Sequence, residues 1–270
     1  MTDEPDWVAP GVDTRRANVA RVYDYLLGGS HNFLADQDAA RAVAAVDPNA
    51  RALARANRQF LGRTVRFLTG AGITQFLDIG SGIPTQGNVH EVAEQVSSGT
   101  RVAYVDVDPV AIAHSKAILA GHSSAAIIEA DLRDPGKILA HETTRQLIDF
   151  SQPVGLLLVS VLPFITDDAD PWHIVAALRD ALVPGSYLAL GHATDENRPV
   201  VAQAAQKAYN RSVTTQARVR SRADILRFFD GFDLVDPGLV SIPLWRPDSP
   251  ADVPSDPSQF WCLGGVARKP

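Results

Sequence analysis

The stretch Gln75-Phe-Leu-Asp-Ile-Gly-Ser-Gly-Ile-Pro-Thr-Gln-Gly-Asn88 decides the fold of this chain. Its first five residues form an apolar run, which predicts a strand that is buried on both faces. The run ends at Gly80-Ser81-Gly82, where the missing side chains allow positive φ and let a ligand approach the backbone closely. Pro84 and Thr85 predict the start of a helix that continues to Val96. This order of strand, glycine turn and helix is typical of the cofactor site at the carboxyl edge of an open parallel sheet.

The charge of the turn distinguishes two classes of cofactor. A dinucleotide fingerprint, G-x-G-x-x-G, offers free helix N–H groups to a pyrophosphate. Here Thr85 stands at the third glycine position, Pro84 has no N–H, and Asp78 places a carboxylate at the end of the strand. An anion would be repelled there, whereas a ligand with an ammonium and a sulfonium group would be attracted. The turn therefore favours S-adenosylmethionine over NAD. A G-x-G turn considered alone is about equally often a cofactor-binding turn and a purely structural one.

Two further strands are expected to end in acids at the same edge of the sheet. Residues 100–106 form an apolar strand that ends in Asp106, the position where an acid binds ribose hydroxyls in doubly wound folds. Asp108 precedes Pro109 and is expected to cap a helix, so it needs no ligand. The next strand, residues 125–129, leads to Asp131 and Leu132, which can accept a hydrogen bond from an adenine amino group and cover its ring. Three acids at three successive strand ends make a specific signal for a nucleoside-containing cofactor.

Longer stretches of the sequence carry a family resemblance. They are Val19-Ala-Arg-Val-Tyr-Asp-Tyr-Leu-Leu-Gly-Gly29, Asn57-Arg-Gln-Phe-Leu61, Gln75-Phe-Leu-Asp-Ile-Gly80, Asn88-Val-His-Glu91, Tyr104-Val-Asp106 with Asp108-Pro109, and Gly185-Ser-Tyr-Leu188. From about residue 17 to residue 270 the chain resembles a family of S-adenosylmethionine-dependent methyltransferases that was long catalogued as a domain of unknown function. The resemblance implies a class I methyltransferase fold and a cofactor site at Asp78, Gly80, Gly82, Asp106, Val107, Asp131 and Leu132. We add Ser81, which lies between the two glycines.

Two positions depart from the family pattern. Ser30 follows the double glycine where a lysine is common, and Pro163 stands where a histidine often follows the fourth strand. The family supplies no known methyl acceptor. Two alternatives to a methyltransferase therefore stay open: a protein that binds S-adenosylmethionine or S-adenosylhomocysteine without turnover, and, more remotely, an NAD-dependent oxidoreductase.

Composition limits the function further. The chain has 270 residues and a formal net charge of −6, which argues against general nucleic-acid binding. The sequence contains no apolar run of about 20 residues, so no membrane span is predicted. The acidic N-terminus does not look like a signal peptide. Cys262 is the only cysteine, which fits a reducing cytoplasm. We expect a cytoplasmic enzyme with a small-molecule acceptor and no metal; the sequence does not indicate an oligomeric state.

We expect three segments: a flexible tail (residues 1–15), a helical extension (16–70) and the methyltransferase domain (71–270). Helices are predicted at 16–27, 32–45 and 47–70. Polar residues around Gly28-Gly29 suggest that the extension closes over the cofactor as a lid. The arginines of the third helix are interpreted as a solvated face; they are Arg51, Arg55, Arg58, Arg63 and Arg66.

The remaining strands are predicted at residues 154–160, 185–190, 232–235 and 260–268. We expect seven strands in the order 3-2-1-4-5-7-6, mostly parallel, with the seventh antiparallel. His192 follows the fifth strand and Tyr23 lies in the extension, and these two are the candidates for a catalytic base. A cluster of Arg211, Arg218, Arg220 and Arg222 is interpreted as a solvated loop rather than a site for an acidic substrate group.

Overall fold

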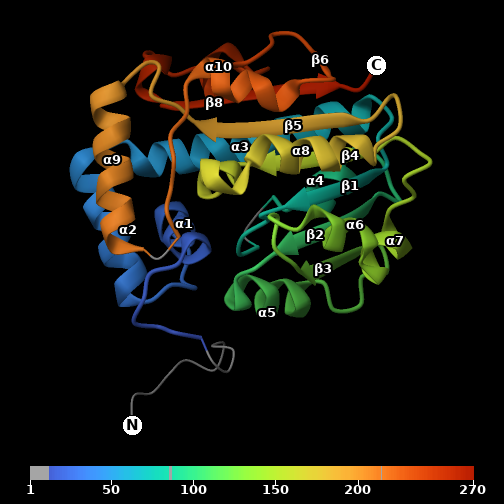
Figure 1. Cartoon of the computed structure of the whole chain (residues 1–270), viewed down its shortest axis with the longest axis horizontal. Helices are drawn as coiled ribbons and strands as arrows, with labels where there is room; N and C mark the ends of the chain where they lie inside the picture. The colour runs from blue at the N-terminus through green and yellow to red at the C-terminus, as the bar shows by residue number, and fades with distance from the viewer. Residues whose placement is uncertain (1–11, 85–86, 214) are drawn as a thin grey trace.

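The computed structural model describes residues 12–84, 87–213 and 215–270, so most of the expected tail and Thr85 lie outside the described residues. One mixed sheet forms the centre of the molecule, in the order β3-β2-β1-β4-β5-β8-β6, with β7 paired to β8 (Figure 1). The pairs among β1 to β5 are parallel, and β8 runs antiparallel to its neighbours. The strands are β1 (Gln75–Ile79), β2 (Arg101–Asp106), β3 (Ala125–Glu129), β4 (Gly155–Val159), β5 (Tyr187–Ala193), β6 (Asp233–Leu234), β7 (Val240–Ser241) and β8 (Cys262–Arg268).

The expected fold class and strand order are confirmed, with β8 as the expected seventh strand. The two-residue β7 was missed in the sequence, because it lies in the proline-rich stretch that precedes β8 and carries no alternating pattern. Its Val240 and Ser241 pair with Gly264 and Leu263 of β8.

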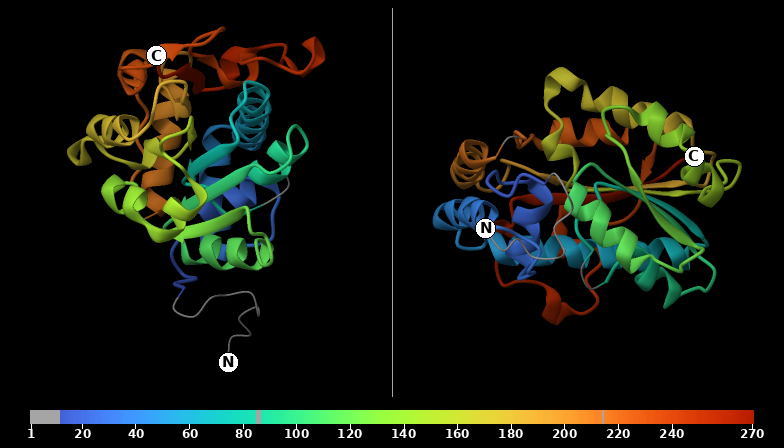
Figure 2. Two further views of the ribbon diagram at one scale, coloured as in Figure 1. Left: turned by 90° about the vertical axis from the view of Figure 1, so that its right-hand side faces the viewer. Right: turned by 90° about the horizontal axis from the view of Figure 1, so that it is seen from below.

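Helices cover both faces of the sheet (Figure 2). Side chains alternate along a strand, so Phe76 of β1 packs into the core on the α3 side and Leu77 into the core on the α8 side. Both residues are completely buried, as expected for a central parallel strand. The helices of the domain are α4 (Val89–Glu94), α5 (Pro109–Ile118), α6 (Pro135–Ala140), α7 (Glu142–Leu147), α8 (Pro171–Asp180), α9 (Pro199–Ser212) and α10 (Arg222–Leu226).

The extension consists of α1 (Val19–Leu27), α2 (Leu34–Val46) and α3 (Ala50–Gly70). Asn18 caps α1 through a hydrogen bond from Ala20 N, and Gly28 ends it in the left-handed conformation. Helix α3 lies along the sheet, whereas α1, α2 and α9 gather beyond the end of β5 (Figure 1). That end is the carboxyl end of the parallel strands. No helix in the described ranges is long and apolar enough to cross a membrane.

One helix begins later than the sequence predicts. We expected a start at Pro84, but α4 begins at Val89 with Asn88 as its N-cap residue. Gly87 has a φ of 73°, which is incompatible with a continuous right-handed helix. The Glu91 carboxylate accepts a hydrogen bond from Asn88 N and stabilises the later start.

Candidate active site

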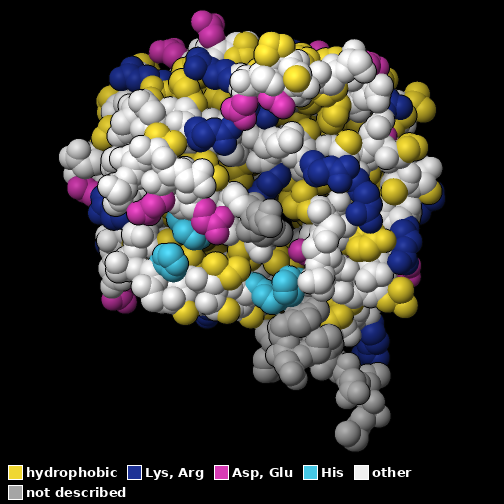
Figure 3. Space-filling view, turned by 180° about the vertical axis from the view of Figure 1, so that it is seen from behind, with side chains coloured by type: hydrophobic (Ala, Val, Ile, Leu, Met, Phe, Trp, Pro, Cys, Tyr) yellow, Lys and Arg dark blue, Asp and Glu magenta, His cyan; other side chains and the backbone are white. Residues whose placement is uncertain are grey.

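A cavity of about 560 Å³ lies at the carboxyl ends of β1, β2, β3 and β4. Helices α1, α3 and α9 form its other walls. The face seen in Figure 3 is hollowed near its centre, where hydrophobic side chains lie beside basic ones. The cavity wall includes all eight predicted cofactor residues, which are Asp78, Gly80, Ser81, Gly82, Asp106, Val107, Asp131 and Leu132. The structure thus brings these residues together, and their contacts with a cofactor stay a prediction.

The two glycines of the turn are required for different reasons. Both have positive φ, 76° for Gly80 and 69° for Gly82. A Cβ at Gly80 would clash with the Val161 side chain, so packing inside the protein leaves no room for a larger residue at this position. Among the described residues, a Cβ at Gly82 would meet nothing within 4 Å. We expected both positions to be open toward the ligand, and only Gly82 has this property.

Asp106 organises the turn as well as facing the cavity. Its Oδ2 accepts a hydrogen bond from Gly82 N at 2.7 Å, and its Oδ1 accepts from Val107 N and Asp108 N at 2.8 and 2.9 Å. Burial raises the pKa of the Asp106 carboxyl, while these three N–H groups lower it by binding the charged form. Asp108 caps α5, as predicted, through hydrogen bonds from Val110 N and Ala111 N.

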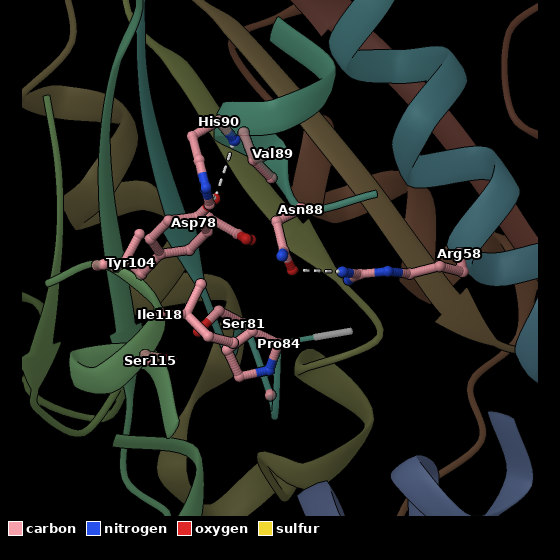
Figure 4. Close-up of a pocket in the computed structure, with 12 residues that line it drawn as sticks. Arg58, Asp78, Ser81, Pro84, Asn88, Val89, His90, Tyr104, Ser115 and Ile118 are labelled. Carbon is pink, nitrogen blue, oxygen red and sulfur yellow. Dashed lines mark hydrogen bonds between the residues drawn. The ribbon is translucent and has the colours of Figure 1, made fainter. Parts of the chain in front are cut away.

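Asp78 and Arg58 face the same space beside Asn88 (Figure 4). Arg58 reaches in from α3, and its Nη2 donates to Asn88 Oδ1 at 3.1 Å. Burial raises the pKa of Asp78 to about 7; the Arg58 charge lowers it and the Asp106 charge raises it further. In the described part of the chain, the buried Arg58 Nε and Ser81 Oγ have no hydrogen-bond partner. A buried polar atom without a partner is costly unless a ligand or water binds it.

The structure corrects the interpretation that all the arginines of α3 form a solvated face. Arg58 lines the cavity, and Arg63 is buried, donating to the carbonyl oxygens of Ile242 and Trp245 at 2.7 and 2.9 Å. Helical spacing alone could not separate these two from the exposed Arg55, because the face that α3 turns to the strand ends is decided by the tertiary fold. The available signal was the placement of Arg58 inside the matched stretch Asn57-Arg-Gln-Phe-Leu61.

The predicted adenine site is partly occupied by an internal ion pair. Arg133 binds both carboxylate oxygens of Asp131, at a shortest distance of 2.6 Å, and lowers the pKa of that carboxyl. Leu132 beside it is buried, and Val107 is 56% exposed. Asp131 must share its oxygens with Arg133 if it accepts a hydrogen bond from an amino group.

Tyr23 lies on the cavity wall, in a network of neutral groups. Its hydroxyl donates to the Ala54 carbonyl at 3.0 Å and accepts from Asn57 Nδ2 at 3.1 Å. The Asn57 Oδ1 accepts from Ser160 Oγ at 2.8 Å. Burial raises the pKa of Tyr23, and it raises the pKa of the neighbouring Cys262 to about 12, so both stay protonated at neutral pH. These groups can orient a ligand but are poor bases.

The structure does not bring His192 to the cavity. Alternation along β5 places its side chain on the α8 face, where it stacks on Phe228. Its Nε2 accepts from Arg220 Nη1 at 2.8 Å, which leaves Nδ1 to donate to the Ala193 carbonyl. Burial lowers the pKa of His192 to about 3, so the imidazole is neutral. Arg220 itself is 3% exposed, which corrects its interpretation as a residue of a solvated loop.

The extension contributes to the cavity wall, and its role as a lid stays a prediction. Residues Asn18 to Leu26 on and around α1 contribute to the wall. The Asp24 carboxylate accepts from His31 N and Asn32 Nδ2, so polar contacts do hold the glycine corner. That α1 opens and closes stays a prediction, which slower hydrogen exchange of α1 on addition of S-adenosylhomocysteine would support.

Residues 5–270 match the family model described as S-adenosyl methyltransferase. The chain belongs to this family. S-Adenosyl-L-methionine is therefore its cofactor, and the site contains groups that suit it: carboxylates at three strand ends, an open glycine and an arginine nitrogen without a hydrogen-bond partner among the described residues. Helix α4, which follows the turn, begins only at Val89. Its free N–H groups therefore do not lie at the glycine turn, where a pyrophosphate would need them.

Solved structures agree with this assignment. The chain is similar to a candidate methyltransferase from Thermobifida fusca YX, with 42% identity, coverage of 98% of this chain and 99% of that chain, and a TM-score of 0.93. It is also similar to a DUF574 family protein from Streptomyces avermitilis MA-4680, with 38% identity, coverage of 96% and 99%, and a TM-score of 0.92. The plantazolicin methyltransferase BamL shares the fold at 13% identity, coverage of 93% and 95%, and a TM-score of 0.55. A search of curated proteins finds no match.

Proposed function

We propose that this protein transfers a methyl group from S-adenosylmethionine to a small molecule held in the same cavity. One observation carries the proposal: the cavity runs without interruption from the acids at the β1, β2 and β3 ends to an apolar space between α1, β4 and α9. The first part suits a nucleoside, and the second leaves room for an acceptor. Because α1 covers the cavity, a small acceptor fits better than a polymer.

The cofactor would be held by groups of opposite charge at its methionine end. Arg58 and the Ser81 hydroxyl suit its carboxylate, and Asp78 suits its ammonium group. Asp106 would accept one ribose hydroxyl in addition to the three N–H groups that it already binds, since a carboxylate has about four acceptor sites. Asp131 and Leu132 would face the adenine, with Asp131 shared with Arg133.

The residues of the cavity supply alignment and exclusion of water more than proton transfer. When bound, the cofactor would supply an activated methyl group on a sulfonium, with a neutral thioether as the leaving group, and a proton displaced from the acceptor would pass to bulk solvent after the transfer. Holding two reactants in line can supply much of the acceleration. Ser160 directly follows β4 and is linked by hydrogen bonds to Asn57 and Tyr23, and these three residues are proposed as positioning residues. His192 is left out, because it lies on the other face of the sheet.

A methyl-transfer assay tests this function. The purified chain is incubated with S-adenosylmethionine that carries a radioactive methyl group, together with panels of neutral aromatic phenols and amines, total RNA or denatured protein. We expect the label in the small-molecule panel and S-adenosylhomocysteine in an equal amount. Label in RNA or protein instead would contradict the small-molecule acceptor. Binding of the cofactor without transfer to any of the three would favour the non-catalytic alternative.

A further inference from the structure

The cavity has a distinct apolar end, which we call the α1–α9 chamber. Its wall is formed by Val22, Leu26, Phe164, Ala205, Tyr209 and Trp261, and the same residues belong to one hydrophobic cluster. The chamber lies on the side of β4, β5 and β8, whereas Asp78, Asp106 and Asp131 lie at the ends of β1, β2 and β3. The cavity therefore separates a charged part from an apolar part.

Charged groups around the chamber already have partners within the protein. Arg218, at the rim, pairs with Asp167 at 3.2 Å. Asp47 accepts from Trp261 Nε1 at 2.6 Å and lies 3.6 Å from Arg198. A charged ligand would have to lose its hydration without gaining an opposite charge, which is strongly unfavourable.

Tyr209 contributes one buried polar group next to this apolar space. Its side chain comes from α9, is 9% exposed and packs against the Phe164 ring at 5.7 Å between centroids. Its hydroxyl has no hydrogen-bond partner among the described residues. Burial raises the pKa of Tyr209, so the hydroxyl stays protonated and can donate. Because an unpaired buried hydroxyl is costly, a ligand that accepts this hydrogen bond gains affinity.

We propose that the α1–α9 chamber binds the methyl acceptor, and that this acceptor is an uncharged, flat, largely apolar molecule with one oxygen or nitrogen that accepts a hydrogen bond from Tyr209. This inference rests on the proposed function, because it assigns the acceptor part of the same cavity. The three aromatic residues of the wall, Phe164, Tyr209 and Trp261, favour a ring over an extended chain.

Calorimetry with three naphthalene probes tests the chamber. 2-Naphthol is neutral and has an oxygen, naphthalene lacks the oxygen, and 2-naphthoate is charged. We expect 2-naphthol to bind the full chain, both free and saturated with S-adenosylhomocysteine, and 2-naphthoate to bind at least about tenfold more weakly. Tyr209→Phe should weaken the binding of 2-naphthol about three- to tenfold, the range for one hydrogen bond, and leave the affinity for naphthalene unchanged.

A matched pair of tryptophan variants controls for steric effects. Leu26→Trp should fill the chamber and abolish binding of 2-naphthol, whereas Leu34→Trp, at a side chain that is 67% exposed, should not. All three variants should bind S-adenosylhomocysteine as the original chain does. Tyr209→Phe should not lower the melting temperature, because it removes a hydroxyl that has no partner.

Three results would overturn the proposal: no binding of 2-naphthol, equal or tighter binding of 2-naphthoate, or no effect of Leu26→Trp. A failure of the original chain to bind S-adenosylhomocysteine would instead contradict the proposed function. Since the probes are also titrated into the free protein, the two failures can be told apart.

Discussion

Replacing Arg58 by leucine is expected to weaken binding of S-adenosylhomocysteine by about 1.5–3 kcal/mol, or roughly 10- to 150-fold, the range for a hydrogen bond to a charged group. Arg58 lines the cavity next to Asp78, and its buried Nε has no partner among the described residues. The variant removes the one cation that we assign to the carboxylate of the methionine end. Isothermal titration calorimetry measures the loss.

Arg55→Leu is the matched control, because Arg55 lies on the same helix and is exposed. It carries the same change of charge and should leave the affinity within about twofold. If both variants weaken binding equally, the effect comes from the overall charge of the protein. If Arg58→Leu binds as the original chain does, Arg58 does not contact the ligand.

Replacing Arg220 by methionine is expected to lower the free energy of unfolding by about 3–5 kcal/mol. The Arg220 guanidinium donates to the carbonyl oxygens of Leu162 and Ile165 at 3.1 and 2.7 Å, and to His192 Nε2 at 2.8 Å. All three acceptors are buried, and each one left unpaired costs about 1–3 kcal/mol. Methionine keeps the apolar contacts of the side chain but supplies no donor. Urea denaturation measures the loss.

Arg220 also forms an ion pair with Asp167 at 2.7 Å, and Arg218 pairs with the same carboxylate at 3.2 Å. The control is therefore Arg218→Met, which removes only an ion pair with Asp167. The Arg218 side chain is 55% exposed, so this variant should cost less than about 1 kcal/mol. Equal losses in the two variants would show that Asp167, and not the buried carbonyl oxygens, accounts for the role of Arg220.

The sheet could be predicted from the sequence because its signals are local. An apolar run, a glycine turn and an acid at the strand end each lie within a few residues, as in Gln75–Ile79 and the turn that follows. Parallel strands bring such ends to one edge, so the meeting of Asp78, Asp106 and Asp131 followed from the fold class. The role of α1 as a lid, which rests on the family resemblance, stays a prediction.

The other parts of the site depend on tertiary contacts that no local pattern encodes. Arg58 and Arg55 look alike in the sequence, and only the packing of α3 distinguishes them. His192 lies at a strand end as predicted, but a shift of one residue along a strand reverses the face that a side chain occupies. The α1–α9 chamber unites residues such as Val22, Phe164 and Tyr209, which are far apart in the chain.

The most direct test of the central claim, that this cavity binds S-adenosylmethionine with Asp78 at its ammonium group, is a titration with S-adenosylhomocysteine at pH 8 and pH 6. Burial raises the pKa of Asp78 to about 7 in the free protein. A bound ammonium group favours the ionised carboxylate, so affinity is greatest above that pKa and falls as the pH falls through it.

We predict saturable binding that is about tenfold weaker at pH 6 than at pH 8, a weaker and nearly pH-independent affinity for Asp78→Asn, and no binding of NAD. Absence of saturable binding at pH 8, or an affinity of the original chain that is equal at the two pH values, would contradict the account.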